Sequence, residues 1–109
     1  MTLKLEYLHD TLIANPEGRI DTNNYAQFEE QIIEALSKEP SRIILNLADL
    51  FYMSSSGLRV FVMLQKKMTA SGKKLILCNL QEGIQEIFDI SGLSSVFTIT
   101  TGLQEALNI

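Results

Sequence analysis

The sequence has one cysteine, one histidine and no tryptophan among its 109 residues. A single cysteine, Cys78, excludes an internal disulfide and a metal site built from cysteines. With His9 as the only histidine, the chain has few means for metal catalysis or for a Ser-His or Cys-His catalytic pair. We therefore expect no metal site, no cofactor and no enzymatic activity.

Long apolar runs and a surplus of basic residues are also missing. No stretch approaches the ~20 apolar residues that a membrane-spanning helix needs, and the chain opens without a signal-peptide pattern, so we expect a cytoplasmic protein. The formal net charge is −4, whereas nucleic-acid phosphates are bound by clustered Lys and Arg. We expect no nucleic-acid partner, no membrane span, and one domain over residues 1–109, because this length has room for a single core.

The sequence does contain a regular alternation of extended and helical patterns. Two extended segments, 3–8 and 11–20, flank a predicted tight turn at His9-Asp10. A kink is expected near Pro16, because proline cannot donate to a strand ladder. Later apolar residues follow strand or helix spacing: strands at 43–47, 75–79 and 96–99, and helices at 23–38, 59–68, 81–90 and from residue 101.

The order of these segments is β-β-α-β-α-β-α-β-α. Strands alternating with helices predict parallel βαβ units with right-handed crossovers, and the opening hairpin adds an antiparallel pair. Asp21 or Thr22 is the expected cap of the first helix. The prediction is an α/β fold with a mixed, mostly parallel sheet of about five strands.

The stretch 50–58, Leu-Phe-Tyr-Met-Ser-Ser-Ser-Gly-Leu, connects a predicted strand to a predicted helix. In α/β sheets, binding sites form beyond the carboxyl ends of strands, where loops lead to helix N-termini. A serine at such a place can cap the helix by accepting a backbone N–H. It can also carry a phosphate that the same N–H groups stabilise. The pattern alone leaves both roles open, and the cap is the commoner one.

This stretch, read from Leu45 to Leu58, resembles the signature of the STAS domain family, the bacterial anti-sigma factor antagonists. In that family an apolar strand and an Asp-containing loop lead to Asp-Ser-Ser-Gly-Leu or Asp-Ser-Thr-Gly-Leu. Three further pieces match the family in register: Gly-Arg-Ile-Asp at 18–21, Gly-Lys-Lys-Leu at 72–75 and Phe-Asp-Ile-Ser-Gly-Leu at 88–93. The resemblance covers nearly the whole chain. It implies a single STAS-type domain with helices packed mainly on one side of the sheet.

The resemblance also implies a function and a switch. Family members bind an anti-sigma factor, usually a GHKL-type serine kinase, and so release the sigma factor that it holds. The kinase phosphorylates the first serine of the turn and blocks this binding, and a cognate phosphatase restores it. Aligned on Gly57-Leu58, that serine is Ser55, with Ser54 and Ser56 as the alternative acceptors. The expected state of the protein is a monomer or weak dimer.

The predicted partner contacts surround the turn. The resemblance carries over an acid at Asp21, and the helical pattern places Met63 among basic residues on the face away from the sheet, where a methionine is an adaptable contact. The predicted contacts are Asp21, Ser54, Ser55, Ser56, Gly57, Arg59 and Met63.

One position departs from the family pattern, because Ser54 stands where the family has an acid. A carboxylate there could orient the acceptor hydroxyl or change the charge that the kinase meets, and a serine does neither. The alternative function is therefore a STAS scaffold in a transporter-associated or stressosome-like complex, without phosphorylation.

Two other interpretations of the central stretch fit the residues poorly. A receiver-type phosphoacceptor at Asp49 would need an acidic pair after the first strand and a lysine after the last, and the sequence has neither. A serine hydrolase would need Gly-x-Ser-x-Gly, and Met53 stands in place of the first glycine. His9 in a predicted turn is typical of surface, and Cys78 in an apolar strand is typical of core packing.

Overall fold

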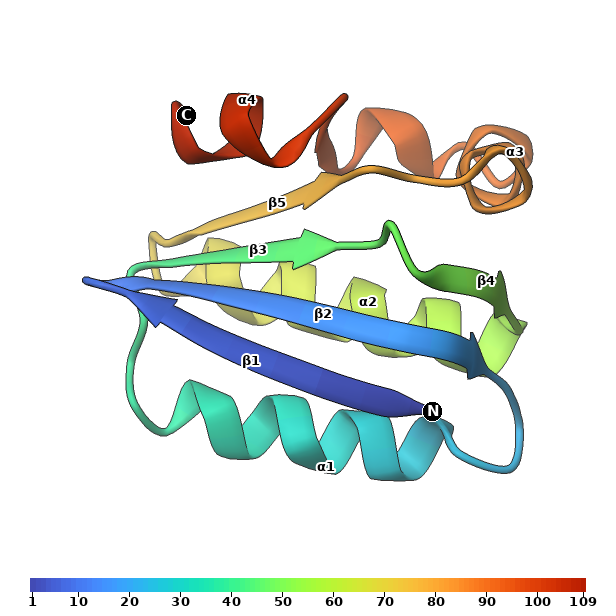
Figure 1. Ribbon diagram of the computed structural model, residues 1–109, viewed down its shortest axis with the longest axis horizontal. Coiled ribbons are helices and arrows are strands. Elements are labelled where there is room, and N and C mark those ends of the chain that lie inside the picture. The colour runs from blue at the N-terminus through green and yellow to red at the C-terminus, as the bar shows by residue number, and fades with distance from the viewer.

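The computed structural model describes all residues, 1–109, as one sheet with helices on both faces (Figure 1). The strands are β1 (Thr2–Leu8), β2 (Thr11–Ile20), β3 (Arg42–Asn46), β4 (Leu50–Met53), β5 (Lys74–Cys78) and β6 (Thr98–Thr100). The helices are α1 (Tyr25–Leu36), α2 (Ser55–Ala70), α3 (Glu82–Ile90) and α4 (Leu103–Leu107), with a 3₁₀ turn at Leu93–Ser95. None of the helices combines the length and the apolar character that crossing a bilayer requires.

The sheet confirms the predicted α/β class. Its order is β1-β2-β3-β5-β6, with β4 pairing the far end of β2. The β1–β2 pair is antiparallel and every other pair is parallel, so the sheet is mixed and mostly parallel. The last strand lies slightly later than predicted, at Thr98–Thr100, because residues 93–95 form the 3₁₀ turn.

The structure has one strand more than predicted: β4 lies in residues that the sequence analysis assigned to the turn. It pairs in parallel with β2, with Tyr52 opposite Arg19 and Met53 opposite Ile20. Its end residues Leu50 and Met53 are buried, whereas the two residues between them are exposed. Four residues without regular alternation give little strand signal, which is why the pattern did not reveal it.

Strand β2 is continuous through its proline. Pro16 is paired with Leu3 of β1, and it lies between the stretches of β2 that pair with β3 and with β4. On the side of β2 that faces β3 and β4, residue 16 has no strand partner that needs a backbone N–H. The missing N–H of proline is therefore tolerated there. The expected irregularity is found slightly later, as a register shift between Gly18 and Arg19.

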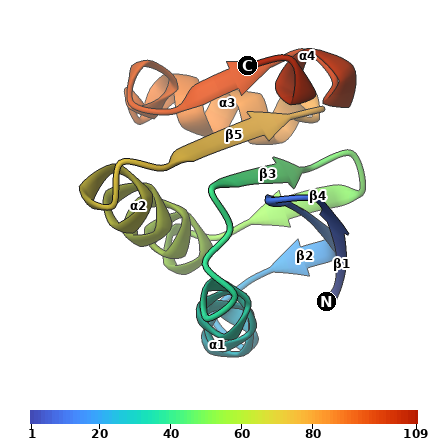
Figure 2. The same ribbon diagram turned by 90° about the vertical axis from the view of Figure 1, so that its left-hand side faces the viewer.

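Helices α1, α2 and α3 cover one face of the sheet and α4 covers part of the other (Figure 2). On the first face a chain of ring contacts links the helices: Phe28 to Phe61 at 5.8 Å, Phe61 to Phe88 at 6.2 Å, and Phe88 to Phe97 at 5.3 Å between centroids. The second face holds a smaller cluster, Ile13, Ile44, Ile76, Cys78 and Ala106. The helices therefore pack mainly on one side, as the resemblance implied.

Candidate functional site

The serine turn lies where three elements meet. Strands β2 and β4 end side by side at Ile20 and Met53, and α2 begins directly after β4. The backbone N–H of Ser54 donates to the Ile20 carbonyl at 2.8 Å, which fastens the turn to the end of β2. The turn is therefore held against the carboxyl end of the sheet, where sites in α/β folds form.

Ser54 is the N-cap of α2. It has extended backbone angles, and its Oγ accepts a hydrogen bond from the Gly57 N–H at 3.3 Å. Its carbonyl accepts the Leu58 N–H at 3.0 Å, the first bond of the helix. Serine and aspartate are both strong N-cap residues, so Ser54 does what an acid could do as a cap here, but it carries no charge.

Gly57 is required by the close approach of α2 to the strands. A Cβ at this position would lie 2.7 Å from Ile20 Cγ2 and 2.9 Å from Met53 Cγ. Both atoms belong to buried side chains at the strand ends. The glycine thus lets the first turn of α2 pack directly on the sheet, which presents the preceding serines at the surface.

The three hydroxyls of the turn have different surroundings. Ser54 is half-buried and accepts the cap bond, and Ser56 is also half-buried. Ser55 is exposed at the first helical position, and the N–H groups at the start of any helix lack intrahelical acceptors. Arg59, four residues later and also exposed, lies on the same side of the helix as Ser55.

Asp21 directly follows the Ile20 carbonyl that holds the turn. Its carboxylate accepts the Arg19 Nε–H at 3.1 Å and the Asn23 N–H at 2.9 Å. The prediction that Asp21 or Thr22 caps α1 is wrong: the N-cap is Asn24, because residues 21–24 form a separate turn before the helix starts at Tyr25. Asp21 instead fixes this turn and its bridge to Arg19 beside the strand ends.

Two aromatic side chains project from β4 next to the serines, and the sequence did not mark them as site residues. Phe51 is 67% exposed and Tyr52 46% exposed. The Arg19 guanidinium lies 4.9 Å from the centre of the Tyr52 ring. Aromatic residues are enriched in protein–protein interfaces. The available signal was the Phe-Tyr pair, which only Met53 separates from the three serines.

Met63 differs from its expected setting. It is half-buried and packs in part against the main core, because it lies at the margin of the face of α2 that covers the sheet. The basic residues of the opposite face, Arg59, Lys66 and Lys67, are exposed as predicted.

The loop between β3 and β4 is held by side-chain amides. Asn79 Nδ2 donates to Asn46 Oδ1 at 2.9 Å, and Gln81 Nε2 donates to the Ala48 carbonyl at 2.7 Å. The exposed Asp49 contributes its carbonyl, which accepts the Gly18 N–H at 2.9 Å. The loop is therefore tied to β2 and to the segment that follows β5.

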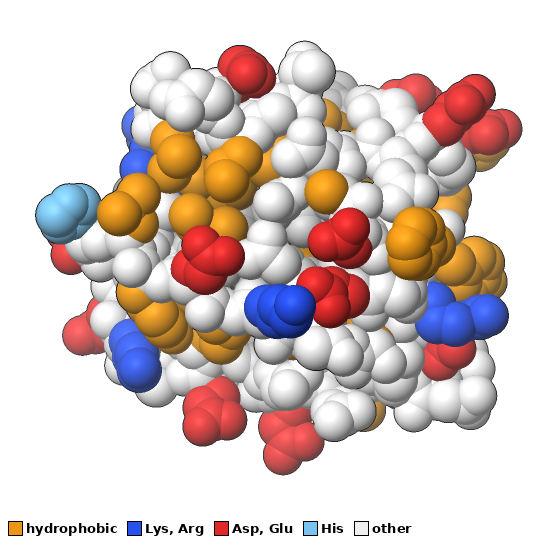
Figure 3. Space-filling view, in the orientation of Figure 1, with side chains coloured by type: hydrophobic (Ala, Val, Ile, Leu, Met, Phe, Trp, Pro, Cys, Tyr) orange, Lys and Arg blue, Asp and Glu red, His pale blue; other side chains and the backbone are white.

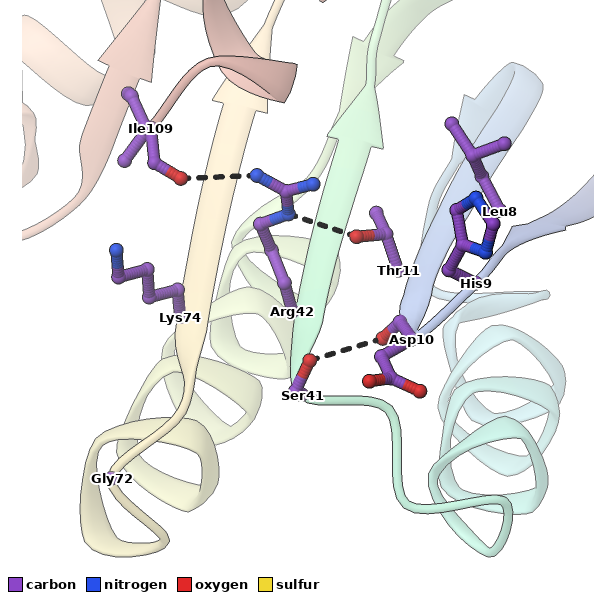
Figure 4. Close-up of a pocket in the computed structure, with 9 residues that line it drawn as sticks. All are labelled: Leu8, His9, Asp10, Thr11, Ser41, Arg42, Gly72, Lys74 and Ile109. Carbon is purple, nitrogen blue, oxygen red and sulfur yellow. Dashed lines mark hydrogen bonds between the residues drawn. The ribbon is translucent and has the colours of Figure 1, made fainter.

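The largest cavity, about 470 Å³, lies at the other end of the sheet, between the β1–β2 hairpin and the starts of β3 and β5 (Figure 4). Arg42 lines it and makes three hydrogen bonds within the protein. Its Nε–H donates to Thr11 Oγ1 at 2.9 Å, and Nη1 donates to the carbonyls of Leu107 and Ile109 at 2.9 and 3.0 Å. Arg42 thus fastens the α4 segment to the sheet.

The remaining reactive side chains lie outside the turn. His9 is exposed in the hairpin, as predicted. Cys78 is buried under α4, as predicted for core packing, and burial together with the negative charge of Glu105 raises the pKa of its thiol to about 11. A thiol with this pKa is protonated at neutral pH and is a poor nucleophile.

Comparison with known proteins gives a consistent family. The family model described as the STAS domain matches residues 2–106. A Bordetella bronchiseptica protein, BtrV, whose name assigns it as an anti-sigma factor antagonist, is 32% identical over 106 residues, which cover 97% of this chain and 91% of BtrV. The anti-sigma-B factor antagonist of Bacillus subtilis is 34% identical over 86 residues, covering 79% of this chain and 78% of that protein.

Solved structures agree with these relatives. The anti-sigma factor antagonist SpoIIAA in its unphosphorylated form superposes with a TM-score of 0.82 at 25% identity, over 98% of this chain and 94% of that chain. The phosphorylated form of SpoIIAA, from Bacillus, gives a TM-score of 0.75 at 25% identity, over 98% of this chain and 97% of that chain. A relative of this chain has thus been observed with and without a phosphate.

Proposed function

The chain belongs to the STAS domain family, and we propose that it is an anti-sigma factor antagonist whose binding is switched off by phosphorylation of Ser55. Its partner is then a serine-kinase anti-sigma factor of the GHKL type, which releases its sigma factor when this protein binds, and a cognate phosphatase resets the switch. The protein acts by binding and carries out no catalysis of its own. The relatives named as anti-sigma factor antagonists support this proposal.

The observation that carries the proposal is the different setting of the three serines. Ser55 is the exposed one, whereas Ser54 is engaged as the helix cap and Ser56 is half-buried. A kinase must reach the acceptor hydroxyl, and loss of the cap would cost the helix about 1 kcal/mol. Ser55 can therefore be modified without a change in the packing of α2.

The surroundings of Ser55 also suit the phosphorylated product. The first turn of α2 contains no acidic residue, and the free N–H groups of a helix N-terminus favour an anion. Arg59, one helical turn further on, can pair with a phosphate on Ser55. The modified turn is thus expected to keep its fold.

The same phosphate would oppose binding of a partner. Ser55 follows the exposed Phe51 and Tyr52 of β4 within four residues, and Arg19 links Tyr52 to Asp21; we name Phe51, Tyr52, Arg19 and Asp21 the turn surface. A phosphate adds roughly −1.5 to −2 charges at neutral pH, which would have to be desolvated in the complex. A loss of ~3 kcal/mol in binding free energy corresponds to more than a hundredfold in affinity.

A serine at position 54, where the family has an acid, affects phosphorylation of Ser55 only by removing a negative charge. Because Ser54 caps α2, the geometry of the turn does not depend on an acid at this position. The hydroxyl of Ser55 then has no neighbouring carboxylate before it in the chain. We infer that the kinase partner of this protein accepts a neutral residue there.

The proposal is tested by incubating the protein with its cognate kinase and ATP and analysing the peptide of residues 53–59 by mass spectrometry. We expect one phosphate on Ser55, absent in Ser55→Ala and present in Ser56→Ala, which leaves the cap intact. Absence of label anywhere in the turn, with kinase binding intact, would contradict the switch and favour a STAS scaffold without phosphorylation.

A further inference from the structure

The first strand leaves one edge of the sheet open. β1 pairs only with β2, and six of its seven residues are exposed. Along such an edge, unpaired N–H and C=O groups can add another strand, and proteins usually cover or interrupt long edges for this reason. The opposite edge, β6, has only three residues. β1 is thus the place where the sheet can be extended.

The register of the hairpin determines which backbone N–H and C=O groups of β1 point towards the open edge. Leu8 and Thr11 flank the two-residue turn at His9-Asp10, and the backbone groups of such flanking residues bond each other. Bonded and non-bonded pairs alternate along an antiparallel ladder. The backbone groups of Leu8, Glu6, Lys4 and Thr2 therefore point towards β2, and those of Leu3, Leu5 and Tyr7 point outwards. The Asn15 side chain donates to the Lys4 carbonyl at 3.3 Å, which agrees with this assignment.

The two faces of β1 have different chemistry. Leu3, Leu5 and Tyr7 lie on the α1 side and line a groove of about 260 Å³ between β1 and α1. Lys4 and Glu6 lie on the opposite side, where Lys4 Nζ is 3.3 Å from Glu17 Oε2 of β2. Figure 3 views this face, where a basic side chain lies among acidic ones over the middle of the sheet. An apolar row on one side and alternating charges on the other give the edge a definite pairing preference.

We propose that β1 pairs antiparallel with β1 of a second copy of this chain, about a two-fold axis that passes beside Leu5. In this register Leu5 lies opposite Leu5 of the second copy, and Leu3 lies opposite Tyr7. These are the residues whose N–H and C=O groups point outwards, so every outward group from Leu3 to Tyr7 gains a partner. The two sheets become one continuous sheet.

Charge complementarity selects this register. Lys4 lies opposite Glu6 of the second copy and Glu6 lies opposite its Lys4, so the dimer gains two cross-strand pairs of opposite charge. A shift that centres the axis on Leu3 or on Tyr7 removes both pairs. A shift that centres it on Lys4 or Glu6 keeps outward backbone groups opposite one another but places two lysines or two glutamates face to face. Only the axis at Leu5 satisfies both the backbone and the charges.

The apolar side of the edge agrees with the same arrangement. The two rows of Leu3, Leu5 and Tyr7 meet across the axis and form one apolar stripe beside both copies of α1. At the hairpin end of the row, Lys38 Nζ lies 4.8 Å from the centre of the Tyr7 ring. This proposal does not depend on the proposed function, because it uses no residue of the turn surface.

A charge exchange tests the pairing in solution. Sedimentation equilibrium of the unmodified protein between 5 μM and 1 mM is expected to show a reversible dimer. Lys4→Glu and Glu6→Lys each place like charges opposite one another and should weaken the dimer about tenfold. The double variant Lys4→Glu with Glu6→Lys restores opposite charges and should recover the dimer. A monomer throughout this range, or a double variant weaker than both single ones, would overturn the proposal.

A cross-link tests the register in a background where Cys78→Ala removes the native thiol. Opposed residues in a bonded antiparallel pair have Cα atoms about 5.5 Å apart, within disulfide reach. Leu5→Cys should therefore form a disulfide-linked dimer on mild oxidation. Lys4→Cys is the matched control, since two copies of Lys4 lie beyond that reach and should stay unlinked. Equal cross-linking of the two variants would contradict the axis at Leu5.

Discussion

The two ends of the sheet use their polar and aromatic side chains differently. At the hairpin end, Arg42 lines the largest cavity, yet it donates to Thr11 and to the carbonyls of the α4 segment. At the turn end, Ser55 and Phe51 are exposed beside a helix N-terminus. Groups that bond within the protein stabilise the fold, and groups left at the surface are available to a partner. The largest cavity and the exposed side chains of the candidate site thus lie at opposite ends of the sheet.

The largest effect on stability is expected at the hairpin end. Arg42→Ala removes three hydrogen bonds and leaves the buried Thr11 hydroxyl without its partner. We expect the free energy of unfolding to fall by about 3 kcal/mol, measured by urea denaturation. Affinity for the anti-sigma factor should stay within threefold under conditions where the variant is folded. A large loss of affinity would contradict the claim that the hairpin end serves stability and the turn end serves binding.

The next effect is expected in binding. Phe51→Ala removes an exposed ring from the turn surface and should weaken the complex by ~2 kcal/mol, about thirtyfold in Kd. Because the ring is 67% exposed, the melting temperature should change little. Ile33→Ala, which shortens a 47% exposed side chain on α1, is the matched control. Equal effects of the two substitutions on affinity would show that Phe51 is ordinary surface.

A smaller effect is expected from the helix cap. Ser54→Ala removes the acceptor for the Gly57 N–H and should lower the free energy of unfolding by about 1 kcal/mol. Ser54→Asp keeps an acceptor in the same place and should retain the stability. If Ser54→Ala leaves the unfolding free energy unchanged, the capping role is wrong.

The buried thiol near the turn end is expected to have no effect at neutral pH, because its effect is confined to alkaline pH. The pKa of Cys78 is raised from 9.0 to about 11 in the folded protein by burial and by Glu105. Its contribution to stability is therefore complete below pH 9 and declines as the pH rises towards 11. Urea denaturation at pH 8 and pH 10.5 should show a larger decline for the unmodified protein than for Cys78→Ala. Identical declines would contradict the raised pKa.

The sequence predicted the parts of the fold that depend on strong periodicity. The apolar spacing of α2 and the runs in β3 and β5 correctly indicated alternating strands and buried helices, and the order gave the mixed sheet. It missed β4, because four residues with two exposed aromatic side chains carry no period. Its pairing is decided by the far end of β2, which is a tertiary contact.

For the candidate site, the sequence predicted the serine turn, and the role of this turn in partner binding stays a prediction. The motif located the serines, but the roles of the three hydroxyls could not be separated by sequence, because capping depends on the backbone angles at Ser54 and on the bond from Gly57. The contact of Arg19 with Tyr52 joins residues far apart in the chain and had no local signal. Helical geometry placed Met63 on the exposed face, whereas the structure shows it half-buried and packed in part against the main core.

The most direct test of the proposed switch is the affinity of the anti-sigma factor for the protein with and without a phosphate on Ser55, measured by calorimetry alongside the two melting temperatures. We expect the phosphate to weaken binding more than a hundredfold while the melting temperature stays nearly constant. Equal affinities, or a loss of binding that follows from unfolding of the phosphorylated protein, would contradict it.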